Sequence, residues 1–352
     1  MHMKTIYLFA ITVIISFSCD RNSVIQGNFS FLVTGNVQGE LYPKKMRRGS
    51  LGGIARRSTF INEVKKNINP IILDAGNLFA GSSSSVALIK SYNAMGYDAL
   101  NVGVEDLSIK NDLKKMKRLA NFPFISANII DKKSGKLAFK PYVIIERNGF
   151  KVGIVGLSNN RNINSDYTIN DPVVIGKKIL KTLARKTRYQ VVMFNGAYDQ
   201  SIQLQKELLE ADFIFVSGHK EIPRKTSVYD GGAFIYSVGE YGQSIVSTKI
   251  SIAHVDSSLK DISMLLEREK FIDETLDLLH GGSSVSVEKM YSGNYDMTQR
   301  IKQIKLELQS ARDELEKTVN SVEFDFIPLS DFIKGDEKIN SIINEENVEL
   351  NK

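Results

Sequence analysis

The sequence contains one cysteine, Cys19, and lacks the patterns that identify several common classes of enzyme. A single cysteine excludes an intrachain disulfide. The glycine-rich turns are followed by neither P-loop nor dinucleotide-binding spacing, so they indicate strand-end turns rather than phosphate-binding loops. No Ser–His–Asp or Cys–His arrangement of a covalent catalyst is visible. After residue 20, no segment of the sequence is long and apolar enough to cross a membrane.

The formal net charge of +6 comes from lysines and arginines that are scattered along the chain rather than clustered. This pattern favours simple solubility, and we expect no nucleic-acid partner. Attraction to an anionic membrane surface is the main alternative that the charge leaves open. Hydrophobic residues make up 42% of the 352 residues and charged residues 24%. These values are typical of a globular chain that forms one large α/β domain or two smaller ones.

The first nineteen residues predict export and attachment to a lipid. Lys4 precedes an apolar run over residues 6–15, and the small residues Ser16 and Ser18 come just before Cys19. A basic start, an apolar core and small residues before a cleavage site are typical of a secretory signal. The residues before Cys19 resemble the relaxed lipobox of bacterial lipoproteins, which implies an acylated cysteine at the mature N-terminus. An ordinary signal peptide with a chance cysteine is the alternative.

The pattern from residue 29 to residue 255 predicts an α/β domain. Short apolar strands bounded by glycines alternate with amphipathic helices, which favours covered sheets with functional loops at the strand ends. A β-hairpin is expected around Asn148-Gly149. We therefore expect the following division of the chain: a signal peptide at 1–18, a lipidated tether at 19–28, the α/β domain at 29–255 and a helical C-terminal extension at 256–352.

Part of this extension, residues 297–320, has the spacing of a coiled-coil seam. Apolar or small side chains follow a 3-4-3-4-3 pattern at Ile301, Ile304, Leu308, Ala311, Leu315 and Thr318. This is a seam of fewer than three heptads. It predicts either a helix that packs onto its own chain or self-association through residues 297–320.

Eight segments within residues 29–255 occur in an order that resembles a known family. The strand-end segments are 34–39, 74–77, 95–106, 193–195 and 217–221, and the supporting segments are 52–57, 122–128 and 149–157. Together they resemble the N-terminal, metal-bearing domain of the 5'-nucleotidase family of calcineurin-like metallophosphoesterases. The resemblance implies a two-sheet sandwich flanked by helices. In that family, two metal ions hold a phosphate ester and a metal-bound hydroxide attacks the phosphorus.

Most residues that would bind these metals are replaced here. The seven ligand positions implied by the resemblance fall on Asn36, Gln38, Asn77, Val104, Asn195, His219 and Glu221. Only His219 keeps its family identity. The family's catalytic histidine falls on Glu105, and the aspartate that orients it falls on Ser108.

Asparagine at 36 and 77 keeps the size and hydrogen-bonding reach of aspartate but removes its negative charge. Because an amide oxygen is a poor ligand for zinc or manganese, we expect no dinuclear site and no cofactor. Hydrogen bonds among the amides are expected to hold the loops instead.

Two functions follow from this interpretation. The first is a membrane-anchored lipoprotein of the bacterial cell envelope, which uses a phosphoesterase fold without catalysis to bind an unidentified envelope or extracellular protein or to support structure. The second is an exported phosphoesterase or nucleotidase-like hydrolase with a rebuilt site for one weakly bound divalent metal. The residues that could form such a site are His219 with Glu221 or Glu105, or the carboxylates of Asp74, Glu105, Asp106 and Glu221.

Overall fold

The computed structural model describes residues 26–79, 84–159, 166–218 and 232–350. The expected signal peptide at 1–18, the expected lipidation site Cys19, and both His219 and Glu221 lie outside these ranges. None of the helices in the described ranges has the length and apolar character that a membrane crossing requires.

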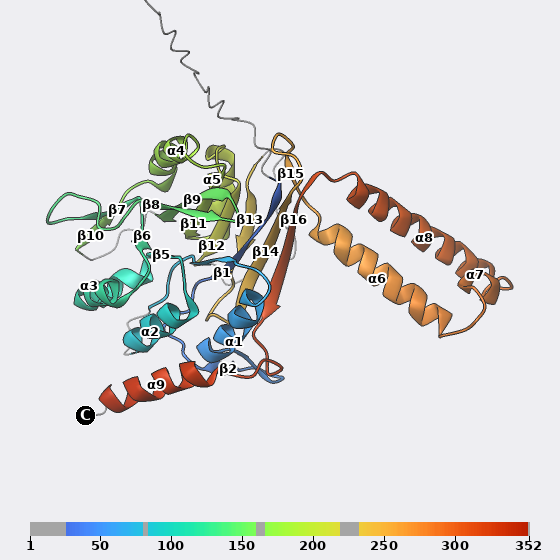
Figure 1. Ribbon diagram of the computed structural model, residues 1–352, viewed down its shortest axis with the longest axis horizontal. Helices are drawn as coiled ribbons and strands as arrows, with labels where there is room; N and C mark the ends of the chain where they lie inside the picture. The colour runs from blue at the N-terminus through green and yellow to red at the C-terminus, as the bar shows by residue number, and fades with distance from the viewer. Residues whose placement is uncertain (1–25, 80–83, 160–165, 219–231, 351–352) are drawn as a thin grey trace, which may run out of the picture.

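Two β-sheets face each other and form the centre of the molecule (Figure 1). The first sheet contains, in spatial order, β15 (Leu259–Asp261), β16 (Asn320–Pro328), β14 (Ser244–Ile252), β1 (Gly27–Thr34), β4 (Ile71–Asp74), β5 (Ala99–Asn101) and β6 (Phe124–Ile125). The second contains β13 (Phe234–Ser237), β12 (Phe213–Ser217), β11 (Tyr189–Asn195), β9 (Phe150–Ser158) and β8 (Tyr142–Arg147). Two small sheets pair β2 (Pro43–Lys45) with β3 (Ser50–Gly52), and β7 (Ile129–Asp131) with β10 (Tyr167–Ile169).

The side chains of β1 alternate between two hydrophobic cores, one on each side of the first sheet. Phe29 and Phe31 point into the core between the sheets, where the ring of Phe31 contacts Phe213 and Phe215 of β12 at centroid distances of 5.6 Å. Leu32 points the other way, into the core beneath the helices. Successive residues of a strand face opposite sides, so one strand contributes to both layers.

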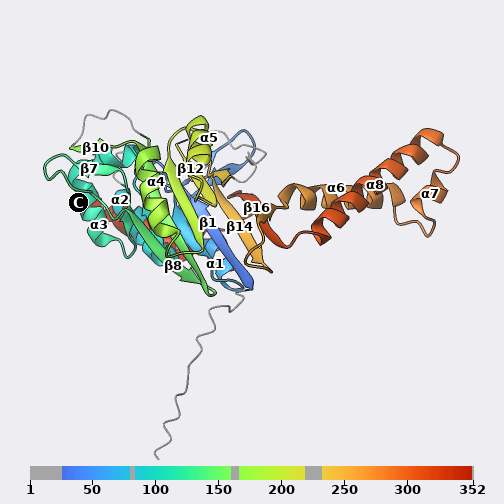
Figure 2. The ribbon, with the colours of Figure 1, turned by 90° about the horizontal axis from the view of Figure 1, so that it is seen from above.

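Helices cover the outer faces of both sheets (Figure 2). Apolar residues of α1 (Ile54–Lys65), α2 (Ser85–Met95), α3 (Lys110–Leu119) and α9 (Glu337–Leu350) pack on the first sheet. Those of α4 (Pro172–Leu183) and α5 (Tyr198–Glu207) pack on the second. A 3₁₀ helix, η1 (Glu105–Ile109), precedes α3. The two-sheet sandwich flanked by helices that the sequence predicts is therefore confirmed.

The hairpin expected around Asn148-Gly149 is also present. Strands β8 and β9 pair antiparallel from Tyr142↔Val155 to Arg147↔Phe150. Asn148 and Gly149 have φ angles of 50° and 83°. Two consecutive left-handed residues are what a tight two-residue hairpin turn requires, and Asn-Gly adopts them at low cost.

The expectation of a wholly helical extension over 256–352 is wrong. Strand β16 pairs antiparallel with β14 from Ser244↔Pro328 to Ser251↔Ser321, and β15 pairs with β16. Val322 of β16 is buried in the core between the sheets. The first sheet therefore continues past residue 255.

The segment between β15 and β16 forms a helical hairpin that projects from this edge of the sheet (Figures 1 and 2). It consists of α6 (Ser263–His280), the short α7 (Val287–Met290) and α8 (Tyr295–Glu316). The seam noted in the sequence faces α6, with Ile301, Leu308 and Ala311 buried. Arg312 of α8 forms ion pairs of 2.8 Å with Glu269 and Asp273 of α6. The seam is therefore covered by a helix of the same chain.

The position of β16 predicts the outcome of two deletions. A chain truncated after residue 255 exposes the edge of β14 and removes Val322 from the core, so we expect aggregation or loss of cooperative unfolding. A matched chain that keeps β15 and β16 and replaces residues 264–316 with a short Gly-Ser linker is expected to unfold at nearly the full chain's temperature. Circular dichroism and size-exclusion chromatography measure both. Equal stability of the truncated chain would contradict the role assigned to β16.

Candidate functional site

The carboxyl ends of strands from both sheets meet at one end of the sandwich. Asn36 and Gln38 follow β1, Asn77 follows β4, Glu105 begins η1 after β5, and Asn195 ends β11. Because the parallel strands of each sheet end at the same edge, residues distant in sequence are brought together there. This is where the resemblance places the metal centre of the family.

The backbone at three of the former ligand positions is left-handed. The φ angles are 53° at Asn36, 54° at Gln38 and 59° at Asn77. Such a conformation costs a non-glycine residue about 1–2 kcal/mol, and asparagine tolerates it better than most. Main-chain hydrogen bonds between the loops hold it, from Asn36 N to Gly76 O at 2.7 Å and from Gln38 N to Asn77 O at 2.9 Å.

The side-chain amides of the same three residues bond to one another. The Oδ1 atom of Asn36 accepts from Gln38 Nε2 and from Asn77 Nδ2, each at 3.2 Å. The Nδ2 group of Asn36 donates to the carbonyl oxygen of Gly239 at 3.1 Å. The Oδ1 atom of Asn77 accepts from the backbone N–H of Glu105 at 3.2 Å. This amide network connects the loops after β1, β4 and β5.

Asn195 extends the network to the second sheet. Its Oδ1 atom accepts from the backbone N–H of Val104 at 2.8 Å, and its Nδ2 group donates to Ser217 Oγ at 2.9 Å. The hydroxyl of Ser217 donates in turn to the carbonyl oxygen of Ala75 at 2.7 Å. Asn195 and Ser217 therefore link the two sheets through hydrogen bonds at this end, in addition to the apolar core between the sheets.

The space between Asn77 and Asn195 is filled by the backbone at Gly103. A Cβ atom at this glycine would lie 2.6 Å from the backbone nitrogen of Asn77 and 2.9 Å from Asn195 Cγ. Only glycine fits at such distances, and Asn36, Asn77 and Asn195 are all buried. The amide network is a closely packed part of the interior.

The buried carboxylate of Asp106 is used to fix the same loops. It accepts from the backbone N–H groups of Asn77 at 3.0 Å, Phe79 at 2.7 Å and Gly103 at 2.7 Å. Burial raises the pKa of Asp106 to about 7, although these hydrogen bonds oppose the rise. Both of its oxygens are thus engaged by the main chain.

Asp74, the last residue of β4, is held by hydrogen bonds to neighbouring protein groups. Its oxygens accept from Thr34 Oγ1 at 2.9 Å, from the hydroxyl of Tyr92 at 2.7 Å and from the N–H of Gly76 at 2.9 Å. Arg57, also buried, donates to the hydroxyl of Tyr92 at 2.8 Å. Burial raises the pKa of Asp74.

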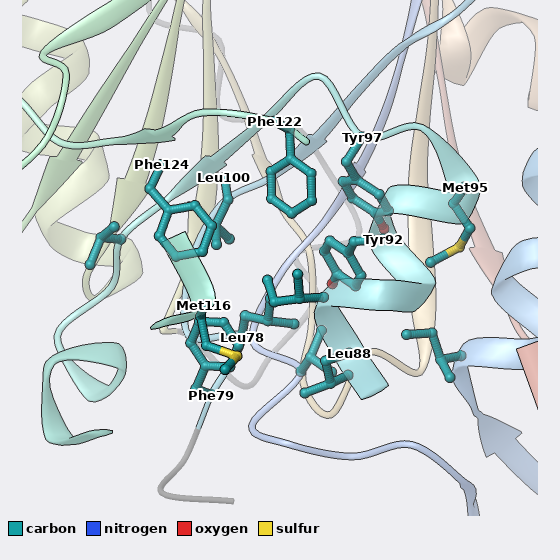
Figure 3. Close-up of a cluster of buried hydrophobic side chains, with 14 of the residues drawn as sticks. Leu78, Phe79, Leu88, Tyr92, Met95, Tyr97, Leu100, Met116, Phe122 and Phe124 are labelled. Atoms are coloured by element: carbon teal, nitrogen blue, oxygen red, sulfur yellow. The ribbon is translucent and has the colours of Figure 1, made fainter. Parts of the chain in front are cut away.

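Tyr92 belongs to the cluster of buried hydrophobic side chains shown in Figure 3. Its ring stacks on that of Tyr97 at a centroid distance of 3.9 Å. Asp74 is therefore part of the packing between the first sheet and α2.

The positions that correspond to the catalytic histidine and its partner are on the surface. Glu105 and Ser108 are both exposed, and the hydroxyl of Ser108 donates to the backbone oxygen of Glu105 at 2.7 Å. The hydroxyl of Ser108 is thus bonded to the main chain, and the histidine–aspartate pair that the resemblance implies is replaced by a glutamate and a serine. Within the ranges that the structure covers, no three His, Cys, Asp or Glu side chains are grouped to hold a metal ion.

The side chains at the former ligand positions do not fit the dinuclear metal centre of the family. The oxygen atoms of Asn36, Asn77 and Asn195 all accept hydrogen bonds from N–H groups. A metal ligand must direct a lone pair at the ion, and two adjacent divalent ions also need carboxylates to offset their repulsion. Asp74 and Asp106, which the alternative interpretation considers as ligands of a rebuilt one-metal site, accept hydrogen bonds from the surrounding protein groups.

Sequence reasoning missed three contributors to this arrangement. Ser217 and Gly103 lie in the strand-end segments, but the sequence assigns them no role because their importance depends on contacts between strands that are far apart in sequence. Asp106 was weighed as a metal ligand, whereas it caps the loop after β5. Its position three residues after Gly103 was the available signal, because aspartate often accepts hydrogen bonds from nearby backbone N–H groups in turns.

No protein-family model matches the chain. Over 203 residues it is 29% identical to a 5'-nucleotidase of Vibrio parahaemolyticus, a match that covers 49% of this chain and 36% of that protein. The matched part spans between 29% and 36% of the length of the first curated relatives.

Two solved structures share the fold. The 5'-nucleotidase precursor of Thermus thermophilus has a TM-score of 0.58 at 21% identity, covering 64% of this chain and 52% of that one. A calcineurin-like phosphoesterase of Bacillus subtilis has a TM-score of 0.64 at 14% identity, covering 92% of this chain and 98% of that one. The fold is that of the calcineurin-like phosphoesterases, and the sequence similarity supports the resemblance to 5'-nucleotidases.

The amide network predicts that Asn36 is important for stability. In Asn36→Gly the left-handed backbone remains easy to adopt, but two amide donors lose their acceptor, so we expect a loss of about 2 kcal/mol of unfolding free energy. Asn36→Ala adds the cost of a left-handed alanine, about 1 kcal/mol more. Urea denaturation measures both.

Asn148→Gly is the matched control, because Asn148 has a similar φ angle of 50° in an exposed turn. Its effect is expected to stay below about 0.5 kcal/mol. An Asn36→Gly variant no less stable than this control would show that the amide of Asn36 contributes nothing.

Proposed function

We propose that this relative of the 5'-nucleotidases, with its calcineurin-like phosphoesterase fold, is a membrane-anchored lipoprotein of the bacterial envelope that binds or supports other components without catalysis. Its loops keep the backbone course of a metal-binding end, while their side chains bond to one another. The family's hydrolytic chemistry needs a metal-bound hydroxide and charged ligands, and neither the amides nor the engaged carboxylates offer these.

One observation carries this proposal. The amide oxygens at three former ligand positions, Asn36, Asn77 and Asn195, each accept an N–H group of the protein itself. The Oδ1 atom of Asn36 already accepts two N–H groups, so a metal bound there would displace one of these donors, at a cost of roughly 1–3 kcal/mol. The network thus favours a rigid end to the sandwich over a cation site.

The position of the expected lipid anchor supports a role in which the protein presents one end of its sandwich away from the membrane. Seven residues separate Cys19 from Gly27, where β1 begins, and an extended chain of that length reaches about 25 Å at most. The amide network follows the other end of β1, after Thr34. A lipid on Cys19 would therefore hold the sandwich near the membrane with the network directed away from it.

A metal-dependent hydrolase is the second candidate, since Glu105 is exposed at the former catalytic position. His219 and Glu221, which lie outside the described residues, would have to complete its site. Of the four carboxylates considered for a rebuilt site, two are already committed within the described structure, as Asp74 and Asp106 show. The remaining groups make at most a weak single-metal site.

Phosphatase assays with metal analysis test the two candidates. The purified chain is incubated with p-nitrophenyl phosphate and with adenosine monophosphate in the presence of Mn²⁺, Zn²⁺ or Mg²⁺. We expect no turnover above the metal-only blank and no stoichiometric metal in elemental analysis. Turnover that Glu105→Gln or His219→Ala abolishes would establish the hydrolase instead. Turnover that both variants retain would indicate a contaminating phosphatase.

Lipid attachment at Cys19 is tested by fractionation and mass spectrometry. The wild-type chain, expressed in a bacterial host, is expected in the membrane fraction with acyl chains on Cys19, because acyl chains add membrane affinity with each buried CH₂ group. Cys19→Ser is expected to remove this modification and release the chain after cleavage. Ser18→Ala, which keeps a small residue, is the control and should remain anchored. An unmodified Cys19 in the exported wild-type chain would refute the anchor.

A further inference from the structure

A hollow lined by cations lies at the end of the sandwich where β1 begins. Its volume is about 430 Å³, and the start of β9, the loop after α4 and the start of β11 surround it. The charged residues that line it are Lys151, Arg185, Lys186 and Arg188, all of them exposed. Arg188 also lines an adjoining pocket together with Asp212. No carboxylate is among the described residues that line the hollow itself.

Helix α4 continues the positive charge away from this hollow. Between Asp171 and Asp199 the sequence contains six lysines and arginines but no aspartate or glutamate. Lys178 and Lys181 are exposed on α4, and their spacing of three residues places them on one face of the helix, which ends just before the hollow. We refer to Lys151, Lys178, Lys181, Arg185, Lys186 and Arg188 as the basic cluster.

Carboxylates of the chain offset little of this charge. Within the described residues, no member of the basic cluster forms an ion pair. Glu146 lies opposite Lys151 across the hairpin of β8 and β9. Lys177, which adjoins the cluster on α4, pairs with Glu207 of α5. The cluster therefore presents an excess of positive charge to the solvent.

The first residues of β1 pack directly against this hollow. The ring of Phe29 lies 5.0 Å, centroid to centroid, from the rings of Phe150 and Tyr189, which both line the hollow. Seven residues separate Cys19 from Gly27, and a chain of that length reaches about 25 Å at most. A membrane that holds an acyl chain on Cys19 would therefore lie within reach of the basic cluster.

We propose that the basic cluster binds the anionic lipid headgroups of the membrane to which Cys19 attaches the chain. The proposal rests on the lipid anchor proposed above, which turns this end of the sandwich toward the bilayer. Each lysine or arginine held near an anionic bilayer adds to the attraction. An acyl anchor combined with a polybasic surface is one of the arrangements that make membrane attachment stable.

A second group of cations, at the opposite end of the sandwich, provides a comparison. Arg47 and Arg48 are exposed in the turn between β2 and β3, and the N–H of Gly52 in β3 donates to Leu329, which follows β16. Strand β16 ends beside the start of β14, whereas β1 begins beside the end of β14. Arg47 and Arg48 therefore lie with the amide network, away from the expected anchor.

Vesicle co-sedimentation tests the contact on the chain that begins at residue 19 and carries Cys19→Ser, so that no lipid is attached. At about 50 mM salt, the chain is expected to bind phosphatidylcholine vesicles that contain about 30% phosphatidylglycerol, and not vesicles of phosphatidylcholine alone. Raising the salt to about 500 mM is expected to weaken the binding at least tenfold, because salt screens exposed charges.

The double variant Arg185→Glu with Lys186→Glu is expected to weaken the binding at least tenfold, and Lys151→Gln several-fold, because each removes positive charge from the surface that faces the lipid. Arg47→Glu with Arg48→Glu is the matched control. It changes the net charge by the same amount as the first double variant, and we expect it to weaken the binding by about twofold at most, because its charges lie at the far end of the sandwich. Circular dichroism checks that every variant is folded.

Equal losses in the two double variants, or equal binding to the two kinds of vesicle, would overturn the proposal. Tighter binding to soluble poly-glutamate than to the anionic vesicles would also overturn it, and would assign the cluster to an acidic protein instead. Because the tested chain has no lipid, these outcomes leave the anchor at Cys19 untouched. The fractionation of the wild-type chain decides the anchor separately.

Discussion

The loops at the carboxyl ends of the strands are held by hydrogen bonds between amide side chains, and the site depends on this constraint. Asn36, Gln38 and Asn77 keep a left-handed backbone that asparagine and glutamine adopt only at a cost. In a metal enzyme of this fold, ions and carboxylates would offset that cost. Here the Oδ1 atom of Asn36 accepts two amide donors, and Asn195 links the loops to the second sheet. The frame is preserved by neutral groups.

The two ends of the sandwich and one edge of its first sheet carry different features. One end of the sandwich is locked by the amide network, and β1 begins at the opposite end, toward the expected anchor at Cys19. At one edge of the first sheet, β16 returns after the α6–α8 hairpin and buries Val322 in the core. The hairpin is thus attached at both ends to a rigid sheet.

Local patterns predicted much of the fold. Glycine-bounded apolar strands marked the sheets, Asn148-Gly149 marked a hairpin, and the spacing of Ile301 and Leu308 marked the seam of α8. The replaced ligands were also visible in the sequence, because each change is read at a single position. Strand β16 differs from the helical expectation, although Val322, Phe324 and Phe326 alternate with Glu323 and Asp325. This period of two is typical of a half-buried strand, so the signal was present in the sequence. That α6 covers the seam depends on tertiary packing.

We infer that neutral amides, rather than metal ions, hold these loops in place. The most direct test is the thermal unfolding midpoint of the purified chain in excess EDTA and in millimolar Mn²⁺ or Zn²⁺. A ligand that binds only the folded state raises this midpoint, by an amount that grows with the logarithm of its concentration relative to its Kd. If the amides hold the loops without metal, the midpoint is the same in all three solutions. A midpoint several degrees higher with metal, lost again when EDTA is added, would contradict this inference.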